Sequence, residues 1–335
     1  MQNLKKCIDT LFENKTVANI IVRVGRGDEV LCDVCGSAED RVLDEHTLFD
    51  MASVTKIVVT SSLALIAIDG GLLSLDDKAS RFFAVPEDKR ELTVRHLMSH
   101  TMGIGHKSLL GGDPEKIENY ILDIPCDIPV GSDVRYSCPG FILLGRILEK
   151  IYGERLDALF EKYVAKPLLM NESGFLPDKA KDIVNSMVAE EMSGTVHDYN
   201  CRHIGGVCGN AGLFSNIADM TKYAKMLIAC GEPIISRDTF ELAAKNHTVG
   251  MSEDRALGFL YVTERYAQGG GLFSPGSIGH CGHTGQSVFV DRKTGLYVII
   301  LSDATVSTVR KYGKERYPDV MRMRADIHAA IKAEL

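Results

Sequence analysis

The 335-residue chain lacks an excess of positive charge, a long apolar run and a regular spacing of cysteines. Its formal net charge is −7 and its lysines and arginines are scattered, so we expect no nucleic-acid partner. The longest apolar stretch, residues 57–68, is interrupted by Thr60, Ser61 and Ser62 and falls short of the roughly 20 residues that cross a bilayer. We therefore also expect no interaction with a membrane.

The start of the sequence lacks the apolar core of a signal peptide, because residues 1–13 carry a charged or polar side chain every few positions. Nine cysteines without a disulfide-module spacing are typical of a reducing compartment. Cys32 and Cys35 form a C-x-x-C pair without a second pair at zinc spacing, which favours two buried or half-buried thiols in a strand over a metal site. We expect a cytoplasmic protein that needs no metal and no other cofactor.

The composition is that of a globular protein, with 45% hydrophobic and 25% charged residues. Residues 2–13 predict a helix, and residues 17–24 and 30–35 predict two strands joined by a turn at 25–28. Strand patterns return from residue 257, and residues 319–334 predict a last helix. Further helices are expected at residues 94–99, 115–121, 141–152, 156–163 and 217–229, the last with Asn216 as its N-cap.

This order of elements predicts an α/β (α+β) fold in which both ends of the chain build one antiparallel sheet flanked by helices. Residues 1–75 together with 251–335 would form the sheet domain, and residues 76–250 a mainly helical insertion domain. Clefts usually form where two such parts meet, so we expect the active site at their junction.

Ser53-Val54-Thr55-Lys56 is the segment most suggestive of chemistry, and it stands where the extended residues 48–51 give way to the apolar run. If a helix begins at the serine, positions i and i+3 share one face and bring the hydroxyl and the amine together. A lysine can take the proton of a serine only when it is neutral, and a helix N-terminus and a buried floor both lower its pKa. The alternative is an N-cap serine followed by a solvated lysine, since about one such match is expected by chance.

Two further segments accompany this pair. Residues 134–140 (VRYSCPG) place Tyr136 in a loop that leads into a helix, and residues 282–286 (GHTGQ) lead into a predicted β-hairpin. In this order, the motifs S-x-x-K, Y-S-x and [K/H]-T-G resemble those of the serine beta-lactamase and penicillin-binding-protein superfamily. Residues 92–104 are similar to the LTVRHLLSHTSGL segment of the branch related to class C beta-lactamases, D-aminopeptidases and esterases. Residues 196–215 are similar to its VHD and GGVAGHAGLFS segments.

The resemblance implies a fold of the beta-lactamase/transpeptidase type and a role for each motif residue. Ser53 would attack a carbonyl and form an acyl-enzyme, while Lys56 and Tyr136 share the proton transfers. The backbone N–H groups of Ser53 and Gln286 would bind the oxyanion. His283, Thr284 and Gly285 would take the place of K-T-G and contact the substrate. Outside this context, Tyr136 would be better explained as a core aromatic residue whose hydroxyl has a partner.

Two departures from the family pattern bear on the substrate. Cys138 stands where the family usually has asparagine, and a thiol is a weak donor and acceptor for an amide. His283 replaces the lysine of K-T-G, and a histidine is mostly neutral at pH 7, which weakens a clamp for a substrate carboxylate. Cys138 thus argues against recognition of amides, including beta-lactams and peptides, whereas His283, which the resemblance also places in esterase-like and D-aminopeptidase-like members, shifts the choice of substrate without arguing against activity.

Three functions stay open at this stage. The first is a serine hydrolase that acts on a small ester or amide, with a small molecule as its only expected partner. The second is a true beta-lactamase, a D-Ala-D-Ala-type carboxypeptidase or a D-aminopeptidase. The third is a catalytically weak penicillin-binding or sensor module. The sequence leaves the natural substrate and the oligomeric state open.

Overall fold

A six-stranded antiparallel sheet forms the centre of one half of the protein. The computed structural model describes residues 1–315 and 317–335, and its strands follow the order β2-β1-β9-β8-β7-β6. Their bounds are β1 Asn19–Arg26, β2 Glu29–Ser37, β6 Leu260–Tyr261, β7 Ile278–Cys281, β8 Ser287–Asp291 and β9 Leu296–Ser302. The first hairpin of the chain thus pairs, through β1, with β9, which lies more than 200 residues later, as the sequence predicts.

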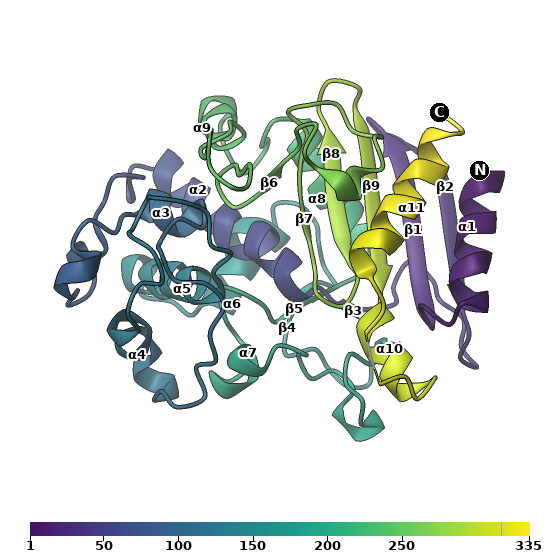
Figure 1. The fold of residues 1–335 in the computed structure, drawn as a ribbon, viewed down its shortest axis with the longest axis horizontal. Helices are drawn as coiled ribbons and strands as arrows, with labels where there is room; N and C mark the ends of the chain where they lie inside the picture. The colour runs from purple at the N-terminus through teal and green to yellow at the C-terminus, as the bar shows by residue number, and fades with distance from the viewer. Residues whose placement is uncertain (316) are drawn as a thin grey trace.

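Helices cover both faces of this sheet. α1 (Gln2–Glu13) and α11 (Val320–Lys332) lie side by side on one face, at the right of Figure 1, where both chain ends are found. The spacing of Leu4, Ile8 and Leu11 puts one apolar face of α1 onto the strands. On the other face, α8 (Ile217–Ile228) packs against β8 and β9.

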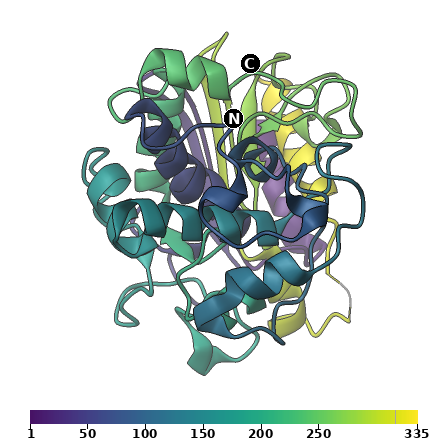
Figure 2. The same ribbon diagram turned by 90° about the vertical axis from the view of Figure 1, so that its left-hand side faces the viewer.

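The other half of the protein consists mainly of helices, which lie at the left of Figure 1 and toward the viewer in Figure 2. They are α2 Ser62–Asp69, α3 Val94–Met98, α4 Ile117–Asp123, α5 Cys138–Tyr152, α6 Leu156–Phe160, α7 Tyr199–His203 and α9 Arg237–Ala243. A small sheet with the order β3-β5-β4 lies between the two halves, formed by Phe49–Asp50, Leu213–Ser215 and Gly174–Phe175. α10 (Ala304–Arg310) directly follows β9.

Most of the elements expected from the sequence are confirmed, including the two terminal helices, the first hairpin and the Asn216 N-cap, whose Oδ1 accepts from Asp219 N at 2.9 Å. The fold class is confirmed as well. The expected helix 156–163 is also confirmed, as an α-helix to Phe160 that continues as a π-helical turn over Glu161–Ala165. Cys35 is exposed rather than buried. The division into two domains at residues 75 and 250 stays a prediction.

The helix that carries the serine–lysine pair is less regular than a single α-helix. Ala52–Val54 form a 3-10 turn, Lys56–Ser61 form a π-helical stretch, and only then does α2 begin. The carbonyl of Ile57 explains part of this irregularity, because it accepts from the side chains of Ser62 at 3.0 Å and Tyr223 at 2.8 Å. Side-chain hydroxyls that bond to helix carbonyls commonly widen or bend a helix.

Together these turns make an 18-residue helical stretch, Ala52–Asp69, that is long and apolar enough by composition to cross a membrane. It is longer than the apolar run 57–68 because the 3-10 and π turns extend it. However, 78% of it is buried inside the protein, which is typical of a core helix. The expected absence of a membrane interaction stays a prediction.

Candidate active site

Ser53 and Lys56 lie on one face of the irregular helix start, as the spacing of the motif predicts. The Ser53 Oγ is 2.9 Å from the Lys56 Nζ, which also donates to the carbonyl of Asn210 at 2.9 Å. Lys56 is fully buried, whereas Ser53 is half-buried and lines a cavity. The alternative of a solvated lysine is therefore wrong, and a hydroxyl and an amine meet at an accessible surface.

Asp50 holds the turn that presents Ser53. Its buried carboxylate accepts from the backbone of Ala52 at 2.8 Å and of His197 at 2.6 Å, and burial raises its pKa to about 6. Ala52 has a φ of +45°, a conformation that costs energy for any residue with a Cβ. The bond from Ala52 helps to hold this strained backbone directly before the serine, and the bond from His197 ties the same carboxylate to another part of the cavity wall.

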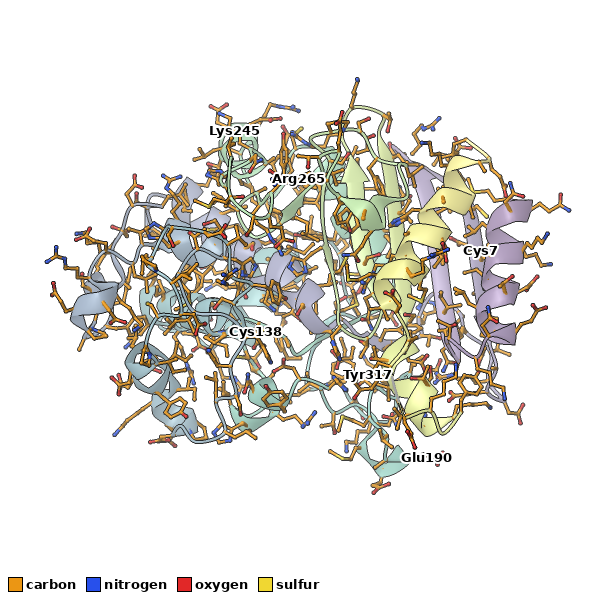
Figure 3. The ribbon with its side chains drawn as sticks, in the orientation of Figure 1. Cys7, Cys138, Glu190, Lys245, Arg265 and Tyr317 are labelled. Atoms are coloured by element: carbon orange, nitrogen blue, oxygen red, sulfur yellow. The ribbon has the colours of Figure 1, made fainter. Side chains whose placement is uncertain are left out.

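Tyr136 and Cys138 complete the floor of the site. The Nζ of Lys56 is 5.1 Å from the centre of the Tyr136 ring, and Cys138 is the first residue of α5, whose N-cap is Ser137. Cys138 lies at the junction of the two halves of the protein (Figure 3). Burial raises the pKa of Tyr136. Burial alone would also raise the pKa of Cys138, but the charge of Lys56 and a hydrogen bond with His106 lower it.

The same groups act on the pKa of Lys56 in opposite directions. Burial alone would lower its pKa, yet the negative charges that Cys138 and Tyr136 can carry raise it above its ordinary value. The prediction from the sequence considers only the helix terminus and the buried floor. It does not include two acidic side chains that reach Lys56 from a different part of the chain. The neutral form of Lys56 that the mechanism needs stays a prediction.

These residues surround a cavity of about 300 Å³. Its lining side chains are Ala52, Ser53, His106, Tyr136, Cys138, His197, Asp198, Tyr199, Ala211 and His283. Four residues proposed from the sequence, Ser53, Tyr136, Cys138 and His283, are in this lining, and a fifth, Lys56, lies in contact with Ser53. His106, His197 and Asp198 are functional candidates that the sequence analysis does not assign a role.

Thr284, Gly285 and Gln286 are buried behind this cavity rather than in its wall. The Nε2 of Gln286 donates to the carbonyls of Asp50 at 2.6 Å and Ser302 at 2.8 Å, and its Oε1 accepts from Thr284 at 2.6 Å. Gly285 has a φ of +111°, and a Cβ there would be 2.1 Å from the Ser302 Oγ. Gln286 thus connects the segment before Ser53 to the end of β9.

A second histidine triplet, His280-Cys281-Gly282, precedes the predicted one by three residues. It lies at the end of β7, the strand that contacts the 3-10 turn of Ser53. The ring centre of His280 is 6.1 Å from that of Tyr136, and a Cβ on Gly282 would be 3.0 Å from the Met51 carbonyl. The triplet 280–282 therefore lies beside the turn that carries Ser53, and His283, the next residue, lines the cavity. The H-x-G pattern, which occurs at both 280–282 and 283–285, is the feature of the sequence that indicates His280 as a candidate.

Behind Tyr136 lies a layer of buried polar side chains that the sequence analysis does not predict. The Arg255 guanidinium is 5.5 Å from the centre of the Tyr136 ring and pairs with Glu253 at 2.8 Å. The ring centre of His100 lies 4.6 Å from that of Tyr136. Burial and then the charge of Arg255 hold the pKa of His100 and His280 well below the ordinary value. Two neutral imidazoles and one cation therefore surround the back of the tyrosine.

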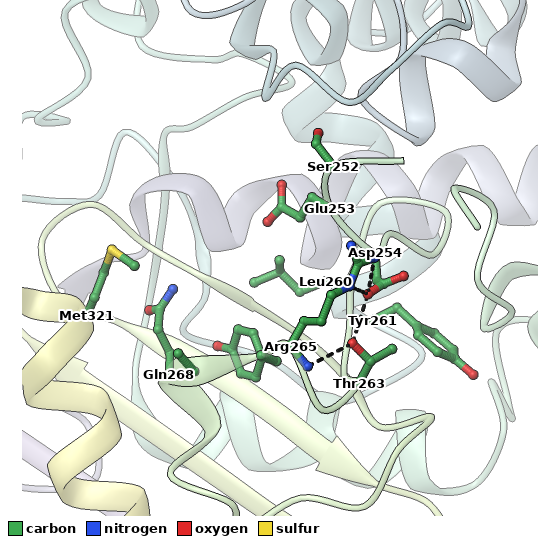
Figure 4. Close-up of a pocket in the computed structure, with 11 residues that line it drawn as sticks. Ser252, Glu253, Asp254, Leu260, Tyr261, Thr263, Arg265, Gln268 and Met321 are labelled. Atoms are coloured by element: carbon green, nitrogen blue, oxygen red, sulfur yellow. Dashed lines mark hydrogen bonds and ion pairs between the residues drawn. The ribbon is translucent and has the colours of Figure 1, made fainter. Parts of the chain in front are cut away.

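Another cavity, of about 200 Å³, lies near residues 252–268 (Figure 4). Its polar groups bind one another: the Asp254 carboxylate accepts from Thr263 at 2.8 Å and forms an ion pair with Arg265 at 2.7 Å. No lysine is among the described residues that line it. The cavity of Ser53 differs from it, because there a serine hydroxyl lies 2.9 Å from a lysine amine.

Comparison with known proteins agrees with this geometry. A family model described as Beta-lactamase matches residues 4–319. A "Putative D-alanyl-D-alanine carboxypeptidase" of Escherichia coli (strain K12) is 26% identical over 309 residues, covering 78% of this chain and 70% of its own. "Esterase EstB" of Burkholderia gladioli is 26% identical over 357 residues, covering 90% and 89%. The solved structure of "EstCE1, a hydrolase with promiscuous acyltransferase activity" has the same fold, with a TM-score of 0.79, 20% identity and 98% coverage of both chains.

Proposed function

The chain belongs to the beta-lactamase family of serine hydrolases, and from this premise we propose that it hydrolyses a small ester or amide through an acyl-enzyme on Ser53. One observation carries the proposal: the Ser53 Oγ lies 2.9 Å from the Lys56 Nζ at the wall of a cavity that Tyr136 also lines. The family resemblance of the motif residues supports the same roles.

Acylation begins when the Ser53 Oγ attacks the substrate carbonyl. Neutral Lys56, the hydrogen-bond partner of Ser53, accepts the serine proton, and the phenol of Tyr136 shares the transfer. The tetrahedral intermediate then collapses, the bond to the leaving group breaks, and the leaving group takes up a proton from the same relay. Water attacks the resulting ester in the second half of the reaction and regenerates Ser53.

The oxyanion needs two backbone donors, which cost no reorganisation during the reaction. The first is the N–H of Ser53. From the sequence, the second is expected at Gln286, but Gln286 is buried and does not line the cavity. We assign this role to the backbone N–H of His283, which follows the triplet that passes Ser53.

Cys138 favours esters over amides in this proposal, and its replacement tests that preference. Cys138→Asn should raise the ratio of amide to ester activity by about tenfold, because asparagine restores a donor and an acceptor beside the reacting carbonyl. The measurement is kcat/KM for a nitroanilide and a nitrophenyl ester of the same acid. Cys138→Ser is the matched control, since it keeps the small size but adds no amide. Equal ratios in all three proteins would contradict the preference.

His283 should make the affinity for anionic substrates depend on pH. Burial lowers the pKa of His283, so its charge is present only below a value under the ordinary 6.5 and is lost as the pH rises through that value. We expect KM for a carboxylate-bearing ester to rise by a few-fold across this range, while KM for a neutral ester does not. His283→Lys should flatten the profile, because a lysine stays charged to about pH 10. Identical wild-type profiles for the two esters would show that His283 does not bind the substrate carboxylate.

A second candidate is a beta-lactamase or D-Ala-D-Ala-type carboxypeptidase, which the name of the Escherichia coli relative favours. A mostly neutral His283 and the thiol of Cys138 argue against it. Intact-mass measurement after exposure to a penicillin and a cephalosporin distinguishes the two. Adducts that form and turn over would support the second candidate, and a stable adduct without ester turnover would support a penicillin-binding module. The cytoplasmic location stays a prediction.

A further inference from the structure

Asp198 is the charged side chain of the cavity wall that neither the mechanism nor the fold requires in its charged form. One carboxylate oxygen accepts from the backbone N–H of Cys201 at 2.8 Å and caps the short helix α7. Asparagine and serine cap helices as well as aspartate does. Capping therefore explains an oxygen acceptor at this position, whereas it does not explain a charge that faces the substrate space.

The other side chains of the wall leave that charge largely uncompensated. Burial and the neighbouring His283 lower the pKa of His197 to about 4, and burial lowers the pKa of His283. Hydrogen bonding to Cys138 raises the pKa of His106, so this imidazole is the group that opposes Asp198 when it is protonated. Among the described residues that line the cavity, Asp198 is the one carboxylic acid, and no lysine or arginine is among them.

The field of Asp198 reaches the whole cavity. Burial is the largest influence on the pKa of Lys56, Cys138 and His283, which form the floor and the rim of the cavity. The negative charge of Asp198 is a smaller contribution that acts on all three. Lys56 has its own partners in Ser53 and Asn210 and does not line the cavity. A cation in the substrate would thus meet a carboxylate, whereas a carboxylate in the substrate would meet a neutral His283 and a like charge.

We propose that Asp198 binds a cationic group of the substrate, so that this site acts on small esters or amides that carry an ammonium. This inference rests on the proposed function, because it concerns the same cavity and the same acyl-enzyme. Asp198 is the specificity residue. Its Oδ1 accepts the hydrogen bond that caps α7, and its Oδ2 is the oxygen that pairs with the ammonium.

The test compares nitrophenyl esters that carry a trimethylammonium group with their tert-butyl isosteres, which have the same shape without the charge. A second pair carries the charge on the alcohol instead of the acid. The buffer is mildly alkaline, to limit the charge on His106. We expect the wild type to prefer the cationic member of at least one pair by about tenfold or more in kcat/KM.

Asp198→Asn should bring that ratio close to one, because it keeps the cap and removes the charge. Asp198→Ser should do the same, which separates loss of charge from any fault in folding of one variant. Asp319→Asn is the matched control: it makes the same change at the N-cap of α11, outside the cavity, and should leave the ratio as in the wild type.

Equal rates for both members of each pair in the wild type would overturn the inference, and so would an unchanged ratio in Asp198→Asn. A merely structural Asp198 would lower the rates for both members together. If fluorophosphonate still labels Ser53 in such a protein, the proposed function stands and only the inference fails. If Ser53 is not labelled in the wild type, the proposed function itself is wrong.

Discussion

Ser53→Ala should reduce the rate of nitrophenyl ester hydrolysis by about five orders of magnitude, to near the background rate. The substitution removes the attacking oxygen and leaves only binding and the oxyanion donors, as happens when the nucleophile of a serine hydrolase is removed. Since the Ser53 side chain is only half-buried, the fold should be unchanged. The measurement is kcat at saturating ester, together with circular dichroism of the variant.

Ser252→Ala is the matched control for this loss. Ser252 is an exposed serine that lines the cavity shown in Figure 4, and the described residues of that lining include no lysine. We expect its activity to equal that of the wild type. A Ser53→Ala protein that retains more than about a hundredth of the wild-type kcat would remove Ser53 from the mechanism.

Lys56→Met should lower kcat by about four orders of magnitude, nearly as far as removal of the serine. Lys56 is the direct hydrogen-bond partner of the Ser53 Oγ and joins it to Tyr136 and Cys138, so its loss leaves the serine without an acceptor for its proton. Methionine fills most of the same buried volume, which limits the cavity left behind. The measurement is kcat for the single variants and for the Ser53→Ala/Lys56→Met double variant.

The double variant should be hardly slower than Ser53→Ala alone, because residues that act as one unit give non-additive losses. Lys89→Met controls for the cost of replacing a buried lysine. Lys89 is also almost fully buried, but it pairs with Asp88 at 2.8 Å, outside the cavity. We expect it to lower stability without a matching loss of kcat. A double variant that loses the product of the two single effects would show that Ser53 and Lys56 act separately.

Local patterns in the sequence predicted the parts of the site that depend on neighbours in the chain. The proximity of Ser53 and Lys56 follows from their i, i+3 spacing, and it holds although the turn is 3-10 rather than α-helical. Asn216 caps α8 for a similarly local reason. The β8–β9 hairpin follows from alternating apolar residues around a turn.

The properties that depend on tertiary contacts could not be predicted in this way. The protonation of Lys56 depends on Cys138 and Tyr136, which are about 80 residues away along the chain. No sequence motif marks Asp50 as a structural support of the site. Its carboxylate accepts hydrogen bonds from the backbone of Ala52 and of His197, and the second of these comes from a distant part of the chain. The sequence contains two consecutive H-x-G triplets, residues 280–282 and 283–285, and only the position of β7 beside Ser53 decides between them.

The central claim is that the reaction passes through an ester on Ser53, and trapping that ester tests it most directly. The protein is quenched in acid during turnover of a nitrophenyl ester, its intact mass is measured, and the modified peptide is identified. We predict a mass increase of one acyl group on the peptide that contains Ser53, in the wild type and in Ser252→Ala but not in Ser53→Ala. An acyl group on the Cys138 peptide instead, or full turnover with no acyl group on Ser53 at any time, would contradict the account.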